Sequence, residues 1–245
     1  MMAAVAPMAS SCQDKLYDER PMNLDRYFPE VVGRRVLDVG CGTGNLGAAL
    51  QQRGNQCYGI TMSPAEAEAA KSQLTDVLLG DVDTWASLPF PRGFFDVVIF
   101  ADVLEHLRHP QQALRLVRPY LASGAQVIAS IPNVANLSVR WNLLCGRFHY
   151  EPAGILDNTH LRFYTLGTAR ALLTETGYQV HGVRFTHWNW CLPQPLRALV
   201  ADREWEVQER MTRWWPGLLA TQFILYAHPA DQTAGHGDVD AWRRW

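Results

Sequence analysis

Short apolar runs and longer amphipathic stretches alternate along the first two thirds of this chain. The apolar runs predict strands over residues 36–39, 56–60, 77–79, 95–100, 125–131, 178–185 and 219–227. The amphipathic stretches predict helices over residues 48–53, 64–74, 110–117 and 166–175. Strands and helices that alternate at this spacing indicate an α/β fold built on a parallel sheet.

The last third of the chain has a different order. No standard crossover helix joins the two late strands, and the helix expected between them has an apolar face made of Leu196, Leu199, Val200, Val207, Met211, Trp214 and Trp215. We expect a tail and cap helix over residues 1–33, one main domain over 34–228 and a flexible tail over 229–245. Within the main domain, residues 132–166 are expected to act as a lid and 190–216 to form a helical insertion.

A glycine-rich turn follows the first predicted strand. Residues Val36 to Gly47 read V-L-D-V-G-C-G-T-G-N-L-G, so a strand leads into a turn and then into a helix. This unit binds nucleotides in doubly wound α/β folds, where glycines allow unusual dihedrals and let a ligand approach the backbone. Asp38, just before the turn, would repel a pyrophosphate. The turn therefore suits a ligand that carries an ammonium and a sulfonium and no phosphate.

The same stretch resembles the first motif of the class I S-adenosylmethionine-dependent methyltransferases, V-L-D-x-G-C-G-T-G. The resemblance implies an α/β fold with a doubly wound, seven-stranded, mostly parallel sheet of the Rossmann-like methyltransferase type, closed by a reversed hairpin and carrying a lid segment after strand five. It also implies S-adenosylmethionine as the cofactor. The residues expected to bind this cofactor are Asp38, Gly40, Gly42, Thr61, Met62, Asp81, Val82 and Ala101. Among them, Asp81 resembles the acid that accepts a hydrogen bond from the adenine amino group.

The end of the second predicted strand departs from the commonest family pattern. That pattern has Asp or Glu there to hold both ribose hydroxyls, whereas this chain reads Ile60-Thr61-Met62-Ser63. Thr61 offers one hydroxyl and cannot hold a diol with two oxygens. The missing acid also counts against a nicotinamide dinucleotide, and we expect Met62 to pack over the adenine.

Candidate catalytic residues follow the fourth predicted strand. If Asp102 begins a helical turn, Glu105 and His106 share a face with it at the mouth of the expected cofactor site. Methyl transfer to a hydroxyl needs a base whose pKa lies near neutrality, which favours His106 as the catalytic base. His160, in the lid, is the second candidate for this role.

The order Asp-x-x-Glu-His also resembles the Glu-x-x-Glu-His cluster with which some family members, including plant small-RNA 2′-O-methyltransferases, hold a divalent cation. Their site uses one further histidine, which His160 could supply here. Carboxylates and imidazoles suit a magnesium- or manganese-type ion. Asp102 reaches less far than a glutamate would, so a divalent metal is an alternative and is not the favoured expectation.

The lid combines polar side chains, arginines and aromatic residues, and long ordered loops usually have a function. It is similar to the I-P-N-x-A-N and L-D-x-T-H-L-R-F-(Y/F)-T stretches of bacterial small methyltransferases, many from glycan or natural-product pathways. The residues expected to contact the substrate are Asn133, Asp157, Arg162 and Tyr164, together with Tyr17 upstream of the sheet. For Asp157 and Arg162, a structural role in which they pair with each other is an equal alternative.

Composition limits the partners. The chain of 245 residues has a net charge of −2 and no Lys/Arg cluster longer than a pair, so no nucleic-acid partner is expected. No apolar stretch approaches membrane-spanning length, so no membrane partner is expected either. The five scattered cysteines and the lack of a signal-peptide pattern favour a cytoplasmic protein. Seven of the nine tryptophans follow residue 187, where the contact of a homodimer is one interpretation.

These observations predict a methyltransferase that moves a methyl group from S-adenosylmethionine to a hydroxyl of a small polar acceptor, a sugar or another biosynthetic intermediate. Three alternatives stay open. The first is a nitrogen or carboxylate methyltransferase on the same fold, and the second is an inactive S-adenosylmethionine-binding partner subunit. The third is a dinucleotide-dependent dehydrogenase, which Asp38 disfavours.

Overall fold

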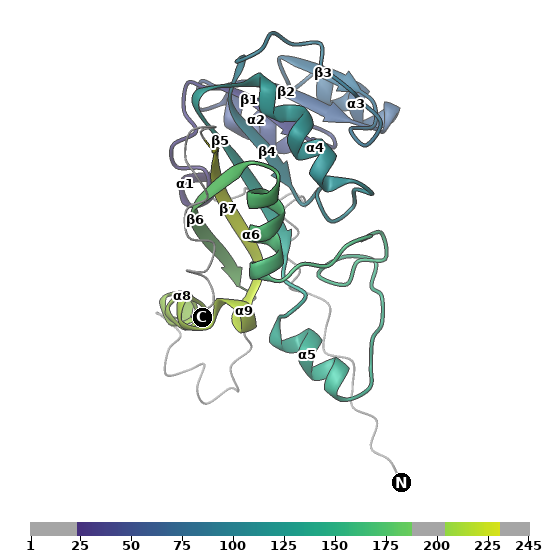
Figure 1. The fold of residues 1–245 in the computed structure, drawn as a ribbon, viewed down its shortest axis with the longest axis vertical. Coiled ribbons are helices and arrows are strands. Elements are labelled where there is room, and N and C mark those ends of the chain that lie inside the picture. Colours follow the sequence, from purple (N-terminus) through teal and green to yellow (C-terminus); the bar gives the residue numbers. More distant parts are fainter. Residues whose placement is uncertain (1–23, 188–203, 231–245) are drawn as a thin grey trace.

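Seven strands form one mixed sheet in the computed structural model, which describes residues 24–187 and 204–230 (Figure 1). The strands are β1 Arg35–Val39, β2 Gln56–Thr61, β3 Asp76–Leu79, β4 Phe95–Ala101, β5 Leu121–Pro132, β6 Tyr178–His187 and β7 Ala220–Pro229. Their order across the sheet is β3-β2-β1-β4-β5-β7-β6. Neighbours from β3 to β5 are parallel, whereas β7 runs antiparallel to both β5 and β6. The expected doubly wound sheet with a reversed hairpin is confirmed.

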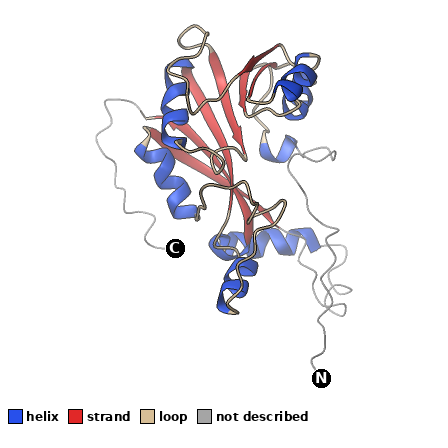
Figure 2. Ribbon diagram, turned by 90° about the vertical axis from the view of Figure 1, so that its right-hand side faces the viewer, coloured by secondary structure: helices blue, strands red, loops and turns tan. Residues whose placement is uncertain are grey.

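Helices cover both faces of the sheet (Figure 2). The helices of the described residues are α1 Leu24–Tyr27, α2 Asn45–Gln51, α3 Pro64–Lys71, α4 Pro110–Val117, the short 3-10 helix η1 Arg118–Tyr120, α5 Leu137–Leu144, α6 Leu166–Glu175, α8 Glu204–Trp214 and α9 Pro216–Leu219. On one face, α4 and α6 contribute Leu114 and Leu172 to the core. On the other face, α2 and α3 contribute Leu50 and Ala70. The core therefore has two apolar layers, with the sheet between them.

Strands β1 and β4 lie at the centre because both of their faces are apolar. From Val36 to Val39, every residue of β1 is buried. Asp96 is the one polar residue of β4, and its Oδ2 accepts a hydrogen bond from the N–H of Arg35 at 2.8 Å. Because β1 and β4 pair in parallel, their carboxyl ends meet at one edge of the sheet.

Two predictions of secondary structure were wrong in detail. Strand β5 begins at Leu121 and not at residue 125, because Leu121 pairs with Phe95 before a shift in register. The lid, predicted as a connection, contains α5. Its start is marked by Asn136, whose Oδ1 accepts a hydrogen bond from the N–H of Ser138 at 3.0 Å. The helix was missed because most of its apolar side chains are exposed and form no stripe that faces a core.

Two expected regions are described only in part. Of the amphipathic helix between the late strands, residues 204–214 form α8, and residues 188–203 lie outside the described residues. The same holds for residues 1–23 and 231–245, so the predicted domain boundaries stay predictions. No helix among the described residues is long and apolar enough to cross a bilayer.

Candidate active site

A cleft of about 570 Å³ opens at the carboxyl ends of β1, β2, β3 and β4. Six of the eight expected cofactor residues line it, namely Gly40, Gly42, Thr61, Met62, Asp81 and Val82. The other two, Asp38 and Ala101, are buried in the strands that lead to it. The cleft lies where an open parallel sheet is expected to bind its ligand.

The glycine-rich turn is tied to β2 through its backbone. The N–H groups of Gly40 and Cys41 both donate to the carbonyl of Ile60, at 2.8 and 2.9 Å. Gly40 has a φ of 77°, and a Cβ at this position would lie 2.5 Å from Cγ2 of Val103. Gly42 has a φ of 53° and no atom within 4 Å of such a Cβ, because it borders open space. The turn therefore presents bare backbone to the cleft.

Asp38 is buried at the end of β1. Burial takes water away from its carboxylate and raises the pKa of Asp38 from 3.8 to about 7. A carboxylate in this state is stabilised by a cation that takes the place of the lost water, such as an ammonium. The environment of Asp38 is therefore consistent with a role in holding the methionine end of the cofactor, which stays a prediction.

Glu66 lines the cleft and was not singled out in the sequence. Its Oε2 accepts a hydrogen bond from the hydroxyl of Thr61 at 2.7 Å. A carboxylate missing at the end of β2 is thus provided by the first turn of α3. The available signal was the pattern Ser-Pro-x-Glu, in which Ser63 caps α3 by accepting from the N–H of Glu66 at 3.4 Å. Only the fold shows that this carboxylate turns toward Thr61.

The turns after β3 and β4 are joined to each other beside the cleft. Oδ1 of Asp81 accepts a hydrogen bond from the N–H of Asp83 at 2.9 Å. The carboxylate of Asp83 in turn accepts from the N–H groups of Arg108 and His109, at 2.8 and 3.0 Å. Met62 lies on the same cleft and is exposed, so its apolar side chain is available to a ligand.

Asp102 does not begin a helix, contrary to the sequence-based expectation. It has a φ of 51°, and residues 104–106 form a turn. Its Oδ1 accepts a hydrogen bond from the hydroxyl of Ser130 at 2.6 Å, and its Oδ2 accepts one from the amide of Gln222 at 2.8 Å. The carboxylate is held by β5 and β7, and it is not among the groups that gather around Glu105.

His106 and His160 come together, with their ring centroids 4.7 Å apart. Nδ1 of His160 lies 3.1 Å from the carbonyl oxygen of Ile155, which can only accept a hydrogen bond. Nδ1 of His106 lies 3.3 Å from the carbonyl and 3.1 Å from the hydroxyl oxygen of Thr159, and that hydroxyl donates to Asp157 at 2.6 Å. These acceptors assign the proton of each neutral ring to Nδ1, so each Nε2 keeps a free lone pair.

Glu105 is buried next to the two rings, with 1 % of its surface exposed. Its Oε1 lies 3.9 Å from Nε2 of His160, and within the described part of the chain neither of its carboxylate oxygens has a hydrogen-bond partner. Burial, followed by the carboxylate of Asp102, raises the pKa of Glu105 well above its ordinary value. Burial, followed by His106, lowers the pKa of His160. Ligand atoms of Glu105, His106 and His160 all lie within 4.8 Å of one another.

The lid is attached to the turn after β4. The N–H groups of Leu161 and Arg162 both donate to the carbonyl of Glu105, at 2.9 and 3.0 Å. The guanidinium of Arg162 donates to the carbonyl of Arg108. Arg162 thus fixes the lid on the turn, and this attachment brings His160 to the side of His106.

Asp157 acts inside the lid. It accepts hydrogen bonds from the N–H and the hydroxyl of Thr159, at 2.8 and 2.6 Å. Although burial by itself raises the pKa of Asp157, these hydrogen bonds and the two histidines lower it. Through Thr159, this carboxylate orients the ring of His106.

Asn133 is fully buried and has structural partners. Its Nδ2 donates to the carbonyls of Ala220 and Gly217, at 2.8 and 3.2 Å, and its Oδ1 accepts from the backbone two residues later at 3.0 Å. Tyr164 is buried and bridged to it through the backbone, and neither residue lines the cleft. The predicted substrate contact of both gains no support from this placement. Tyr17 lies outside the described residues.

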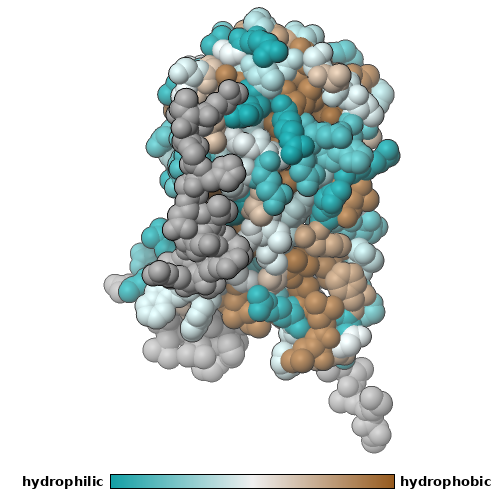
Figure 3. Space-filling view, in the orientation of Figure 1, coloured by the Kyte–Doolittle hydropathy of each residue, from teal (hydrophilic) through white to brown (hydrophobic). Residues whose placement is uncertain are grey.

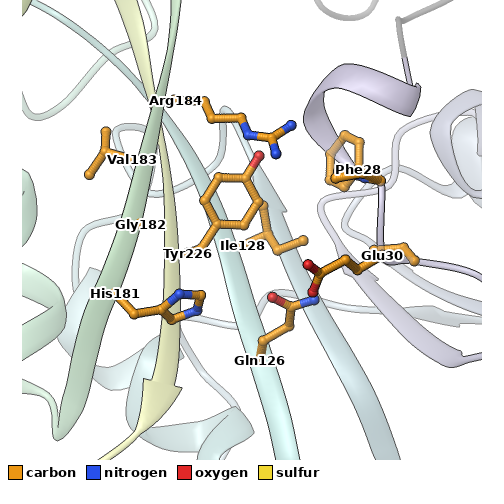
Figure 4. Close-up of a pocket in the computed structure, with 11 residues that line it drawn as sticks. Phe28, Glu30, Gln126, Ile128, His181, Gly182, Val183, Arg184 and Tyr226 are labelled. Carbon is orange, nitrogen blue, oxygen red and sulfur yellow. The ribbon is translucent and has the colours of Figure 1, made fainter.

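A smaller hollow of about 240 Å³ lies against β5, β6 and β7 (Figure 4). The guanidinium of Arg184 is 5.6 Å from the ring centroid of Tyr226, and Glu30 and Gln126 lie on the other side of the hollow. The hydroxyl of Tyr226 donates to the carbonyl of Tyr27 at 2.7 Å. This hollow shares no lining residue with the cleft, so the candidate chemistry is not located there.

The profile of one protein family, described as a methyltransferase domain, matches residues 15–183. The chain belongs to this family. The matched residues include the glycine-rich turn, the cleft and the whole lid, and the resemblance to the class I S-adenosylmethionine-dependent type is confirmed. The match disfavours the dinucleotide-dependent dehydrogenase.

Curated relatives include methyltransferases for oxygen and for nitrogen. The chain is 35% identical over 134 residues to the ubiquinone biosynthesis O-methyltransferase of Alkalilimnicola ehrlichii, which covers 48% of this chain and 51% of that protein. It is 38% identical over 101 residues to a probable tocopherol O-methyltransferase of Oryza sativa subsp. japonica, covering 39% and 28%. It is 35% identical over 106 residues to ajmaline N-methyltransferase of Rauvolfia serpentina, covering 41% and 36%. The chain thus spans about half or less of the length of these relatives.

Solved structures share the fold. An S-adenosylmethionine-dependent methyltransferase from Archaeoglobus fulgidus has a TM-score of 0.57 at 20% identity, and the match covers 83% of this chain and 90% of that one. The [4+2]-cyclase SpnF has a TM-score of 0.54 at 19% identity, covering 84% and 79%. Since a cyclase shares it, this fold alone does not determine the reaction.

Replacing Asp38 by Asn is expected to separate stability from binding. Because the pKa of folded Asp38 is about 7 and its ordinary value is 3.8, the ionised form destabilises the folded protein. Ionisation therefore lowers the free energy of unfolding as the pH rises from 4 to above 7, by roughly 2–4 kcal/mol. We expect Asp38→Asn to be more stable than the native chain at pH 8, equally stable near pH 4, and at least about tenfold weaker in binding S-adenosylmethionine. Urea unfolding across pH and calorimetric titration measure both effects.

The exposed carboxylate variant Asp76→Asn is the control for that experiment. If Asp38→Asn and the native chain lose stability in parallel between pH 4 and 8, the buried carboxylate is not the cause.

Asn133→Ala is expected to lower the free energy of unfolding by about 1–3 kcal/mol, because it removes the hydrogen bonds of a buried side chain to the carbonyls of Gly217 and Ala220 and from the N–H of Ala135. The exposed lid variant Asn158→Ala is expected to change the stability by less than about 0.5 kcal/mol. Chemical unfolding of both variants checks this. If Asn133→Ala keeps the native stability and loses the turnover of an acceptor, the predicted contact of Asn133 with the substrate is supported.

Proposed function

We propose that the protein transfers a methyl group from S-adenosylmethionine to a hydroxyl of a small polar acceptor. The observation that carries this proposal is the pair of imidazoles, His106 and His160, each with a free Nε2, beside the glycine-rich cleft. His106 itself lines that cleft. An imidazole that can act as a base therefore lies next to the expected position of the methyl donor.

The cleft has groups for each part of the cofactor. Asp38, buried in the strand that leads to the cleft, would accept from the ammonium, and the bare backbone at Gly40 and Gly42 allows close approach. Glu66, joined to Thr61, has the carboxylate that can accept hydrogen bonds from ribose hydroxyls. Asp81 lies at the end of β3, where the adenine amino group is expected. When bound, S-adenosylmethionine supplies a methyl group activated by its sulfonium.

The residues of this chain orient the acceptor and take its proton. In the base mechanism, Nε2 of His106 or His160 accepts the hydroxyl proton while the acceptor oxygen bonds to the methyl carbon and the carbon–sulfur bond breaks. Asp157 keeps His106 in place through Thr159. Alignment of the oxygen, the methyl carbon and the sulfur contributes most of the rate in such a displacement.

A second mechanism on the same residues uses a divalent cation. Glu105 has two buried oxygens that, among the described residues, have no hydrogen-bond partner, and one possible ligand atom each of Glu105, His106 and His160 lies within 4.8 Å of the others. The second nitrogen of each ring is fixed by a carbonyl or hydroxyl oxygen, as is common for histidines that bind metals. Glu105, His106 and His160 would hold the ion, whose chemistry is to lower the pKa of the acceptor hydroxyl.

The relatives do not identify the acceptor atom, because their names include both oxygen and nitrogen methyltransferases. An activity assay is needed to identify it. A hydroxyl needs a base or a metal, and an amine that is already nucleophilic needs neither. The crowded set of Glu105, His106 and His160 therefore favours a hydroxyl. An inactive partner subunit would have no use for such a set.

One experiment separates the two mechanisms and tests the function. Purified protein is assayed for methyl transfer to a panel of sugars and other polyols, with EDTA and with added Mn²⁺, and Mn²⁺ binding is followed by electron paramagnetic resonance. In the base mechanism EDTA has no effect, and removal of the acting histidine, by His106→Gln or His160→Gln, lowers kcat about 100-fold or more. In the metal mechanism EDTA abolishes turnover, and Glu105→Gln loses bound Mn²⁺.

The control for the histidine variants is His149→Gln, at an exposed lid position. If both histidine variants and Glu105→Gln keep native rates on every acceptor that is methylated, these three side chains have no part in the reaction. That result would favour the alternative of a nitrogen or carboxylate methyltransferase.

Glu66→Ala is expected to weaken the binding of S-adenosylmethionine by about 10- to 100-fold, because a charge-assisted hydrogen bond to the ribose is lost. Calorimetric titration measures this effect. Glu68→Ala, two residues along α3 and exposed, is the matched control and is expected to bind normally. Equal affinity of both variants would limit Glu66 to its contact with Thr61.

A further inference from the structure

The segment from α5 to the turn that follows it exposes many apolar side chains. Trp141 is 62 % exposed and Leu144 is 78 % exposed, although both are large and apolar. The other exposed members are Leu137, Leu143, Phe148 and Tyr150. These side chains come from residues 137–150, which we call the α5 surface.

The α5 surface lies away from the sheet. Helix α5 is at the lower end of the molecule (Figure 1), and apolar side chains gather over this region in the same orientation (Figure 3). Val139 is the buried residue of α5, and it packs with Ile155 and Leu156 in a small separate cluster. The helix is therefore held on one side, and the rest of its apolar surface is open to solvent.

The charges of the α5 surface all have one sign. Residues 137–150 contain Arg140, Arg147 and His149 and no Asp or Glu, although the whole chain has a net charge of −2. Arg147 is exposed, while Arg140 is exposed and donates to the carbonyl of Ala135. Residues 137–150 thus combine apolar and cationic groups, and the nearest acid along the chain is the exposed Glu151.

The arginines of this surface bear on the choice of partner. In a two-fold contact the surface faces a copy of itself, so the cationic side chains of one copy would meet a surface with the same excess of positive charge, with Glu151 as the adjoining exposed acid. An anionic lipid surface satisfies both features at once. Its phosphates pair with arginines, and its acyl boundary takes up Trp and Leu side chains.

We propose that the α5 surface binds an anionic lipid bilayer. Trp141 and Tyr150 are of the residue types that settle at the interface between headgroups and acyl chains. Leu143 and Leu144 enter the apolar boundary, and Arg147 lies at the level of the phosphates. At the same end of the molecule, Trp214 and Trp215 of the α8–α9 junction are exposed as well. Surface binding of this kind needs no helix that spans the bilayer, which is why the sequence predicted no membrane partner.

The proposal is independent of the methyl-transfer chemistry, because no residue of the α5 surface lines the cleft. It is tested with the full chain by co-sedimentation with vesicles of phosphatidylcholine alone and of phosphatidylcholine with phosphatidylglycerol. We expect binding to the anionic vesicles that falls as salt is added, and binding at least about fivefold weaker to the neutral ones.

Two variants separate the apolar and the cationic contributions to vesicle binding. Trp141→Ser with Leu144→Ser removes the two most exposed apolar side chains of the surface and is expected to weaken vesicle binding about tenfold or more. Arg147→Gln is expected to weaken binding to anionic vesicles about fivefold. Val32→Ser and Arg92→Gln, at exposed positions outside the surface, are the matched controls. Circular dichroism and S-adenosylmethionine binding check that each variant folds.

Failure to sediment with either kind of vesicle overturns the proposal. Equal binding to neutral and anionic vesicles, or variants that bind like the native chain, overturns it as well. Light scattering of the free protein tests whether a second copy of the chain binds the α5 surface instead. A dimer that the double variant Trp141→Ser with Leu144→Ser converts to monomers would assign the surface to that second copy.

Discussion

The parallel pairing of β1 with β2 and β4 is the constraint on which the rest of the structure depends. It brings the carboxyl ends of these strands to one edge, and it allows the N–H groups of Gly40 and Cys41 to reach the carbonyl of Ile60. With the turn held this way, a side chain at Gly40 would collide with Val103, so the chain between β1 and α2 stays bare. The cleft exists because backbone, and not side chains, fills that corner of the sheet.

The candidate catalytic groups depend on a second set of backbone contacts, between the turn after β4 and the lid. Two N–H groups of the lid share the carbonyl of Glu105, and this attachment sets His160 beside His106. The carboxylate of Glu105 is buried and has no hydrogen-bond partner inside the part of the chain that the structure describes, which is costly unless a proton, a metal ion or a ligand compensates its charge. That unbalanced carboxylate is the feature of the site most directly linked to chemistry.

The fold and the activity rest on different observations. The sheet, with its reversed hairpin, is shared with proteins of under 25% identity that include a cyclase, so it carries the binding cleft and not the reaction. The family membership indicates methyl transfer. The proposal that the acceptor is a hydroxyl rests on the two imidazoles at the cleft. The exposed α5 surface lies outside the cleft and adds a property that neither the fold nor the family implies.

The sequence by itself determined which segments form strands and where the glycine-rich turn and Asp38 lie along the chain. These are local patterns, and local hydrogen bonding and periodicity fix the structures that they form. It also predicted six of the residues that line the cleft, because the ends of parallel strands meet at one edge. Only the tertiary structure decided that the carboxylate of Glu66 turns to Thr61, that Asp102 turns to Ser130 and Gln222, and that Asn133 bonds to the backbone before β7. Those outcomes depend on partners between 5 and 120 positions away along the chain, which no local pattern encodes.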